Sequence, residues 1–114
     1  MTRKRTRKKG FTLPVRKLER LAEEATINAY SESEQATGFL TMIEGTIEQP
    51  FETEVLGVPV TVVRFDIEDR DQIVAICQRG RHKQSINLAQ LPLPTPRPRR
   101  AEWIEAYRYW RRRG

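Results

Sequence analysis

The chain has 114 residues, 38% of them hydrophobic, which suits one domain with a modest core. No apolar run approaches the ~20 residues of a membrane span, and the basic start lacks the apolar stretch of a secretory signal, so we expect a cytoplasmic protein without membrane contact. The net charge of +6 conceals an acidic body with basic ends, because residues 1–17 carry eight Lys/Arg and no acid while residues 19–71 carry thirteen Asp/Glu.

The first segment, residues 1–12, is predicted to be a disordered basic arm, since its run of like charges offers little to bury. In one interpretation this arm and the arginine-rich end at 97–114 neutralise the phosphates of a nucleic acid. In the other they are solubilising tails or fold back onto the acidic body. The candidate nucleic-acid-binding residues are Arg3, Lys4, Arg5, Arg7, Lys8, Lys9, Arg111, Arg112 and Arg113.

Two amphipathic helices are predicted next. Apolar residues recur at helical spacing between Leu13 and Tyr30, and again after Ser31, which forms a capping-box pattern with Glu34. Pro50 cannot continue the second helix. Gly38 lies inside that helix, where glycine costs about 1 kcal/mol relative to alanine, so we expect another backbone to approach it closely.

The pattern then changes to that of short β-strands. Segments 51–55, 58–65, 73–77 and 83–88 are rich in β-branched or alternating residues, and Leu56-Gly57 and Arg79-Gly80-Arg81 provide turns. Residues 13–91 are therefore predicted to be an α+β body: helices packed on a small antiparallel sheet that forms an SH3-like, partly open barrel. Cys77 is predicted to be a buried structural thiol.

Residues 92–114 are predicted to be a proline-rich strap and a C-terminal helix of the same domain. Pro92, Pro94, Pro96 and Pro98 favour an extended connector, which suits either a strap across the body or a ligand of an aromatic groove. In the helix that follows, Trp103, Ile104, Tyr107 and Trp110 lie on one face. This face is expected to dock on the core, with base stacking as the alternative.

The chemistry that the sequence lacks is informative. His82 is the only histidine and Cys77 the only cysteine, so a His- or Cys-rich zinc site is excluded. No nucleophile elbow, phosphate-binding loop or dinucleotide fingerprint is present. We therefore expect a protein that is not an enzyme.

Acidic clusters make a hard cation a candidate ligand. Calcium takes six to eight oxygen ligands in irregular geometry, so acidic residues can bind it without an EF-hand, whose pattern this sequence lacks. One cluster is predicted in the polar connection at 66–71. A second is predicted on the edge of the second helix, where two glutamates are expected one helical turn apart. A solvated acidic surface, or one paired with the protein's own arginines, is the alternative. The candidate metal ligands are Glu44, Glu48, Asp66, Glu68, Asp69 and Asp71.

Three stretches resemble the cyanobacterial calcium-binding protein family CcbP. The main one runs from Ala29 to Phe51 and combines an acidic helix start, a Gly-aromatic step, an acidic edge and a Pro-Phe pair. Ser85–Leu88 with Leu91 resembles the late strand and turn of the family, and Glu102–Trp110 resembles its closing helix.

The resemblance implies a small helix-plus-barrel protein that binds calcium through acidic side chains. Glu44 stands at a matching acidic position, whereas Gly45 stands where the family tends to carry another acid. We therefore expect a small non-enzymatic calcium-binding protein, acting as a buffer or regulator. The alternative is a nucleic-acid-associated binding module that acts through the basic ends.

Overall fold

The computed structural model describes residues 10–113 and combines α-helices with one antiparallel sheet, which confirms the α+β class. Most of the predicted basic arm, residues 1–9, lies outside the described part of the chain. In chain order the elements are α1 (Val15–Ala25), α2 (Glu32–Thr46), β1 (Phe51–Val55), β2 (Val58–Glu68), the 3-10 turn η1 (Asp69–Asp71), β3 (Gln72–Arg79), β4 (His82–Asn87) and α3 (Glu102–Arg113).

The capping box that the sequence predicts at the start of α2 is confirmed. The side chain of Ser31 accepts a hydrogen bond from the backbone amide of Glu34 at 3.1 Å, and the Glu34 carboxylate accepts one from the Ser31 amide at 3.2 Å. The end of the helix is a correction, because α2 stops at Thr46 and Ile47 already has extended backbone angles. Glu48 therefore does not lie on the helix, one turn from Glu44, as expected.

The four strands form a meander in the order β1-β2-β3-β4. Leu56 and Gly57 connect β1 to β2 with positive φ angles of 53° and 78°, as a tight hairpin requires. In the described chain β1 and β4 are the two edges of this sheet, so it is open, and the predicted SH3-like barrel is not confirmed. A second correction concerns β2, which continues to Glu68 and takes up half of the predicted polar connection.

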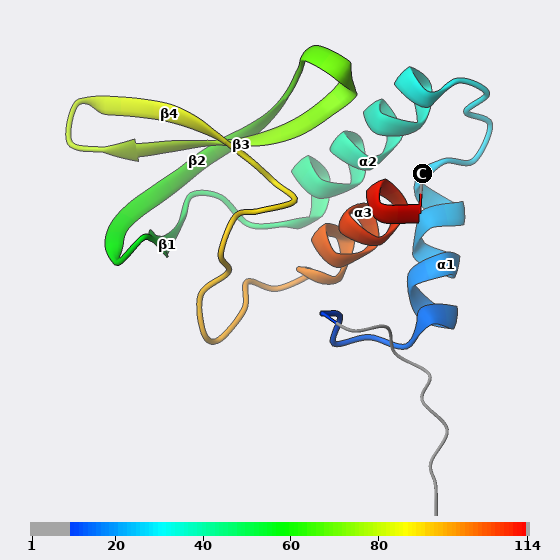
Figure 1. Ribbon diagram of the computed structural model, residues 1–114, viewed down its shortest axis with the longest axis horizontal. Coiled ribbons are helices and arrows are strands. Elements are labelled where there is room, and N and C mark those ends of the chain that lie inside the picture. The colour runs from blue at the N-terminus through cyan, green and yellow to red at the C-terminus, as the bar shows by residue number, and fades with distance from the viewer. Residues whose placement is uncertain (1–9, 114) are drawn as a thin grey trace, which may run out of the picture.

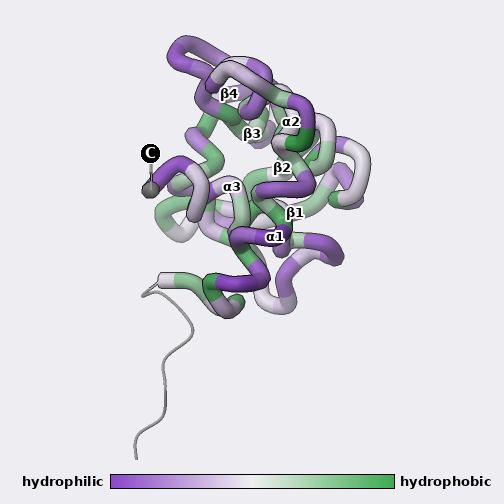
Figure 2. Tube along the Cα trace, turned by 90° about the vertical axis from the view of Figure 1, so that its right-hand side faces the viewer, coloured by the Kyte–Doolittle hydropathy of each residue, from purple (hydrophilic) through white to green (hydrophobic). Residues whose placement is uncertain are grey.

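The helices cover one side of the sheet (Figure 1). α2 packs on β2 and β3, and α3 packs between α2 and α1. Hydrophilic residues predominate along α1 and at the outer turn beside β4 (Figure 2). Side chains from all three helices and from the central strands close the core, including the fully buried Leu18, Phe39, Phe65 and Tyr107.

The close backbone approach that we expect at Gly38 is confirmed. A Cβ atom at this position would lie 2.1 Å from the backbone carbonyl oxygen of Ala25, the last residue of α1. No real Cβ atom sits so near a carbonyl. Glycine therefore allows α2 to pass directly against the end of α1.

Docking of the terminal helix is also confirmed. Trp103, Ile104 and Tyr107 of α3 are all at least 96% buried. Phe39 of α2 lies edge-to-face with Tyr107, their ring centres 5.7 Å apart, and 5.2 Å from the ring centre of Trp110. These aromatic contacts fix α3 against α2, and base stacking by the buried rings is excluded.

The boundary of the predicted basic arm is a third correction. Phe11, expected in the arm, is 7% exposed and lies in the core, with its ring centre 5.9 Å from that of Tyr109. Thr12 is held by hydrogen bonds to Glu105. These residues belong to the folded body, and only the charged residues before Gly10 are left for an arm.

Candidate functional site

The acidic run at 66–71 is divided between a strand and a turn. Asp66 and Glu68 lie near the end of β2, where alternation places both exposed side chains on one face of the sheet. Asp69 and Asp71 lie in η1. Arg70 and Asp71 both have positive φ angles, 64° and 57°, so the chain turns sharply between the two aspartates.

Two of these carboxylates already have partners in the protein. Asp66 accepts hydrogen bonds from the Ile67 amide at 2.8 Å and from Arg64 at 3.1 Å, and these contacts lower the pKa of Asp66. Glu68 accepts one from the hydroxyl of Ser85 at 2.8 Å. The expected alternative, pairing with the protein's own arginines, therefore holds for Asp66.

Glu44 lies in the last turn of α2 and Glu48 lies two residues after the helix ends, and both side chains are exposed. The last turn of α2 carries no basic residue, so the partial negative charge of its carbonyl end is not balanced within the helix. The side-chain amide of Gln49 reaches back to the carbonyls of Glu44 and Ile47. A Cβ atom at Gly45 would meet no atom within 4 Å, so the position has room for a side chain.

The structure does not bring the two acidic groups together. The segment after α2 enters β1 at Phe51, which pairs with Val62, whereas η1 follows Glu68 (Figure 1). The seven residues of β2 from Val62 to Glu68 span roughly 20 Å. Within residues 10–113, no three His, Cys, Asp or Glu side chains gather as a metal site would need.

The donor chemistry nevertheless fits calcium. Carboxylates and backbone carbonyls are the hard oxygen ligands that calcium prefers, and it accepts water in the remaining positions. Asp69 and Asp71 would supply carboxylates at η1, and Glu44 and Glu48 would supply them beside the carbonyl end of α2. Each group holds too few carboxylates for a full ligand set, so carbonyls and water would complete it.

The arginine-rich end of the chain contacts the body. The Arg111 guanidinium lies 5.8 Å from the ring centre of Trp110, and that of Arg112 lies 4.8 Å from the ring centre of Phe11. Nothing is described of the Arg113 side chain. The arm candidates, Arg3, Lys4, Arg5, Arg7, Lys8 and Lys9, are outside the described residues. Across residues 10–113, no helix has the length and apolar character needed to cross a bilayer.

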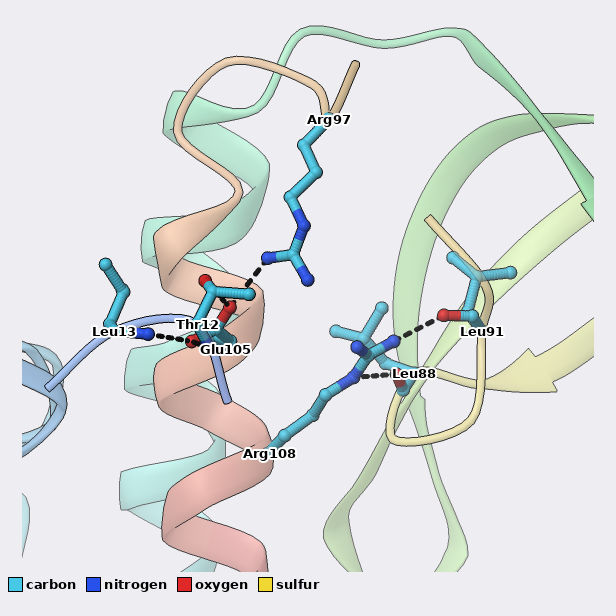
Figure 3. A network of polar contacts seen from close by, with 7 residues as sticks. All are labelled: Thr12, Leu13, Leu88, Leu91, Arg97, Glu105 and Arg108. Atoms are coloured by element: carbon cyan, nitrogen blue, oxygen red, sulfur yellow. Dashed lines mark hydrogen bonds and ion pairs between the residues drawn. The ribbon is translucent and has the colours of Figure 1, made fainter. Parts of the chain in front are cut away.

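A buried polar network in α3 is absent from the sequence predictions. Glu105 is 1% exposed and accepts hydrogen bonds from the amides of Thr12 and Leu13, both at 3.0 Å, and from Arg97 at 2.6 Å (Figure 3). Burial raises the pKa of Glu105, but the hydrogen bonds outweigh it, so the net pKa is lowered. One helical turn later, Arg108 points the other way and donates to the carbonyls of Leu88 and Leu91. The apolar spacing that predicts this helix gives no signal for the role of either Glu105 or Arg108.

Comparisons with known proteins agree with this fold. A family model described as calcium binding, that of the CcbP proteins, matches residues 19–111. The crystal structure of Anabaena CcbP superposes with a TM-score of 0.60 at 17% identity, over 89% of this chain and 93% of that chain, and so shares the fold. No curated protein sequence matches significantly. Because the family model covers most of its length, the chain belongs to the CcbP family of calcium-binding proteins.

Proposed function

We propose that this protein binds calcium through its exposed carboxylates and has no catalytic role, so that it serves as a calcium buffer or regulator. The observation that carries the proposal is the span of the family match, residues 19–111, which contains all six candidate carboxylates. The oxygen donors at both acidic groups are of the type that calcium prefers.

The two groups make different contributions under this proposal. Asp69 and Asp71, at the sharp turn of η1, are the first choice for the principal site, with Glu68 and backbone carbonyls beside them. The turn holds them two residues apart, and a cation would relieve the repulsion between their charges. Glu44 and Glu48 form a second site, which we rank as the weaker of the two. A cation there is favoured by the partial negative charge at the carbonyl end of α2.

A calorimetric calcium titration of three double variants tests this assignment. Asp69→Asn with Asp71→Asn removes the η1 carboxylates, and Glu44→Gln with Glu48→Gln removes those at and just after the end of α2. The matched control is Glu23→Gln with Glu24→Gln, which removes the same charge from an exposed part of α1. We expect saturable heat from the wild type and the control, and a loss of heat in the η1 variant.

The melting temperature gives an independent readout, because a ligand that binds only the folded state stabilises it. Calcium at 100 times its dissociation constant is expected to stabilise the wild type by about 2.7 kcal/mol. A wild type that shows neither heat nor a shift in melting temperature at saturating calcium contradicts the proposed function. Equal losses in all three variants contradict the assignment of the sites.

A further inference from the structure

A hollow of about 270 Å³ lies where the segment before α1 meets the last turns of α3. Among the described residues that line it, half are arginines and none is acidic. The arginines are spaced three and four residues apart, which places them on one face of the helix. The lining residues are Gly10, Phe11, Ala89, Arg108, Arg111 and Arg112.

The three guanidinium groups are held in place by the surrounding structure. Arg108 donates to the carbonyl of Leu88 at 3.1 Å and to that of Leu91 (Figure 3). Arg111 donates to the carbonyl of Asp71 at 3.4 Å and also lies near the Trp110 ring. Arg112 lies over the ring of Phe11, as described above. The carbonyls that contact Arg108 and Arg111 orient these two guanidinium groups, and orientation before binding lowers the entropy that a ligand must offset.

Two features of the hollow define the chemistry of its ligand. Like charges at these helical spacings repel one another, so an anion would be favoured there. Guanidinium groups match the oxygens of a phosphate in pairs, which a compact ammonium cannot do. The volume is just below the roughly 300–1,000 Å³ of pockets that enclose whole drug-sized ligands, so the hollow suits one or two phosphate groups.

The sequence beside the hollow extends the same charge. Gly10 lines it, and the residues immediately before Gly10 include six Lys/Arg between positions 3 and 9. If those residues reach the same ligand, a nucleic-acid backbone gains more from them than a small phosphorylated compound does.

We propose that the arginine hollow formed by Arg108, Arg111 and Arg112 is a phosphate-binding site, which adjoins the η1 turn where Arg111 donates to the Asp71 carbonyl. The phosphate belongs either to a small phosphorylated compound or to a nucleic-acid backbone, and the two sources differ in whether charges beyond the hollow contribute. Without such a ligand, the arginines would balance the negative end of the α3 dipole and hold the carbonyls that Arg108 and Arg111 contact.

The test is a calorimetric titration of the full chain with inorganic pyrophosphate in calcium-free buffer at moderate salt. The variant Arg111→Gln with Arg112→Gln removes two of the guanidinium groups. Arg108 is left unchanged because it also holds the segment after β4. The matched control is Arg79→Gln with Arg81→Gln, which removes the same charge from exposed positions around the β3–β4 turn.

We expect one pyrophosphate per wild-type chain, weakened about tenfold or more in the Arg111/Arg112 variant and less than about twofold in the control. Thermal unfolding of both variants verifies that they are folded. A wild type that does not bind, or equal weakening in the variant and the control, overturns the proposal, because binding would then follow net charge alone.

A second titration, with a single-stranded DNA 12-mer, identifies the source of the phosphate. If the oligonucleotide binds more tightly than pyrophosphate and both are weakened in the Arg111/Arg112 variant, the hollow holds a nucleic-acid phosphate. If only pyrophosphate binding is weakened, the hollow holds a small phosphorylated compound. If neither is weakened while the oligonucleotide still binds, the site lies elsewhere and the proposal is wrong.

Discussion

The carboxylate of Glu105 accepts a hydrogen bond of 3.0 Å from the backbone amide of Thr12, which lies 93 residues earlier in the chain. The same carboxylate accepts from Leu13 and forms an ion pair with Arg97. One buried side chain thus joins the segment before α1, the proline-rich strap and α3. The consequence for stability can be measured.

Replacing Glu105 with glutamine is expected to destabilise the protein by about 2–4 kcal/mol. The amide nitrogen of glutamine would face hydrogen-bond donors, and Arg97 would lose its counter-charge. Urea unfolding at neutral pH measures the change. Glu102→Gln, in the same helix but only half-buried, is the control and is expected to change the free energy of unfolding by less than about 0.5 kcal/mol.

Acid should weaken the fold through the same residue. The folded-state pKa of Glu105 is lowered from the ordinary value of 4.5, so its contribution is fully present above pH 4.5 and is lost as the pH falls through the lowered value. Unfolding free energies measured between pH 7 and pH 3 should therefore fall more steeply for the wild type than for Glu105→Gln. Parallel curves would show that another group dominates the acid response.

Gly38→Ala should be destabilising even though alanine favours helices. The added Cβ would lie 2.1 Å from the Ala25 carbonyl oxygen, and the resulting displacement of α1 or α2 should cost about 1–3 kcal/mol. Gly45→Ala is the matched control in the same helix, because its Cβ meets no atom within 4 Å. There alanine should stabilise the protein by up to about 1 kcal/mol. Thermal unfolding of the two variants should give shifts of opposite sign.

Gly45→Glu tests whether the end of α2 binds calcium. The side chain has room, and it adds a carboxylate next to Glu44 and close to the carbonyl end of the helix. Calorimetry should show tighter calcium binding, by about tenfold, in this variant than in Gly45→Gln, which has the same shape without the charge. Equal affinities in the two variants would place calcium elsewhere.

Tyr107→Phe should cost about 1–3 kcal/mol, because the buried hydroxyl accepts a hydrogen bond from the Ile73 amide at 2.9 Å. Without the hydroxyl that amide has lost its partner in the core. Hydrogen exchange at Ile73 should become faster in the variant. Tyr30→Phe is the control, since Tyr30 is 87% exposed, and its unfolding free energy should change by less than about 0.5 kcal/mol.

Local signals in the sequence predicted local structure well. The Ser31–Glu34 pattern specified the helix start because both partners lie within four residues, and Leu56-Gly57 specified its hairpin for the same reason. Gly38 indicated a close approach because glycine in a helix interior is unfavourable, although Gly45 in the same helix meets no such contact. The spacing of Trp103 and Tyr107 was enough to predict that the last helix docks.

Non-local contacts account for what the sequence missed. Glu105 reads as a solvent-exposed helix residue, and its burial depends on donors from Thr12 and Arg97, distant in the chain. The burial of Phe11 was missed because the run of charged residues before it predicted a disordered arm. The alternation of Asp66, Ile67 and Glu68 did mark a strand, but the density of acids favoured a loop. The candidate calcium ligands were chosen by residue type, and residue type alone cannot say which carboxylates share an ion.

The central position of α3 also constrains the order of folding during synthesis. Phe39, Phe65 and Leu18 can bury their side chains fully only after residues as late as Tyr107 have left the ribosome. Until then the apolar faces of α1, α2 and the sheet are exposed together, and closing the link between Thr12 and Glu105 requires almost the whole chain. Such distant contacts slow folding. They therefore lengthen the period in which the apolar faces of the helices and the sheet are exposed and can be bound by a chaperone.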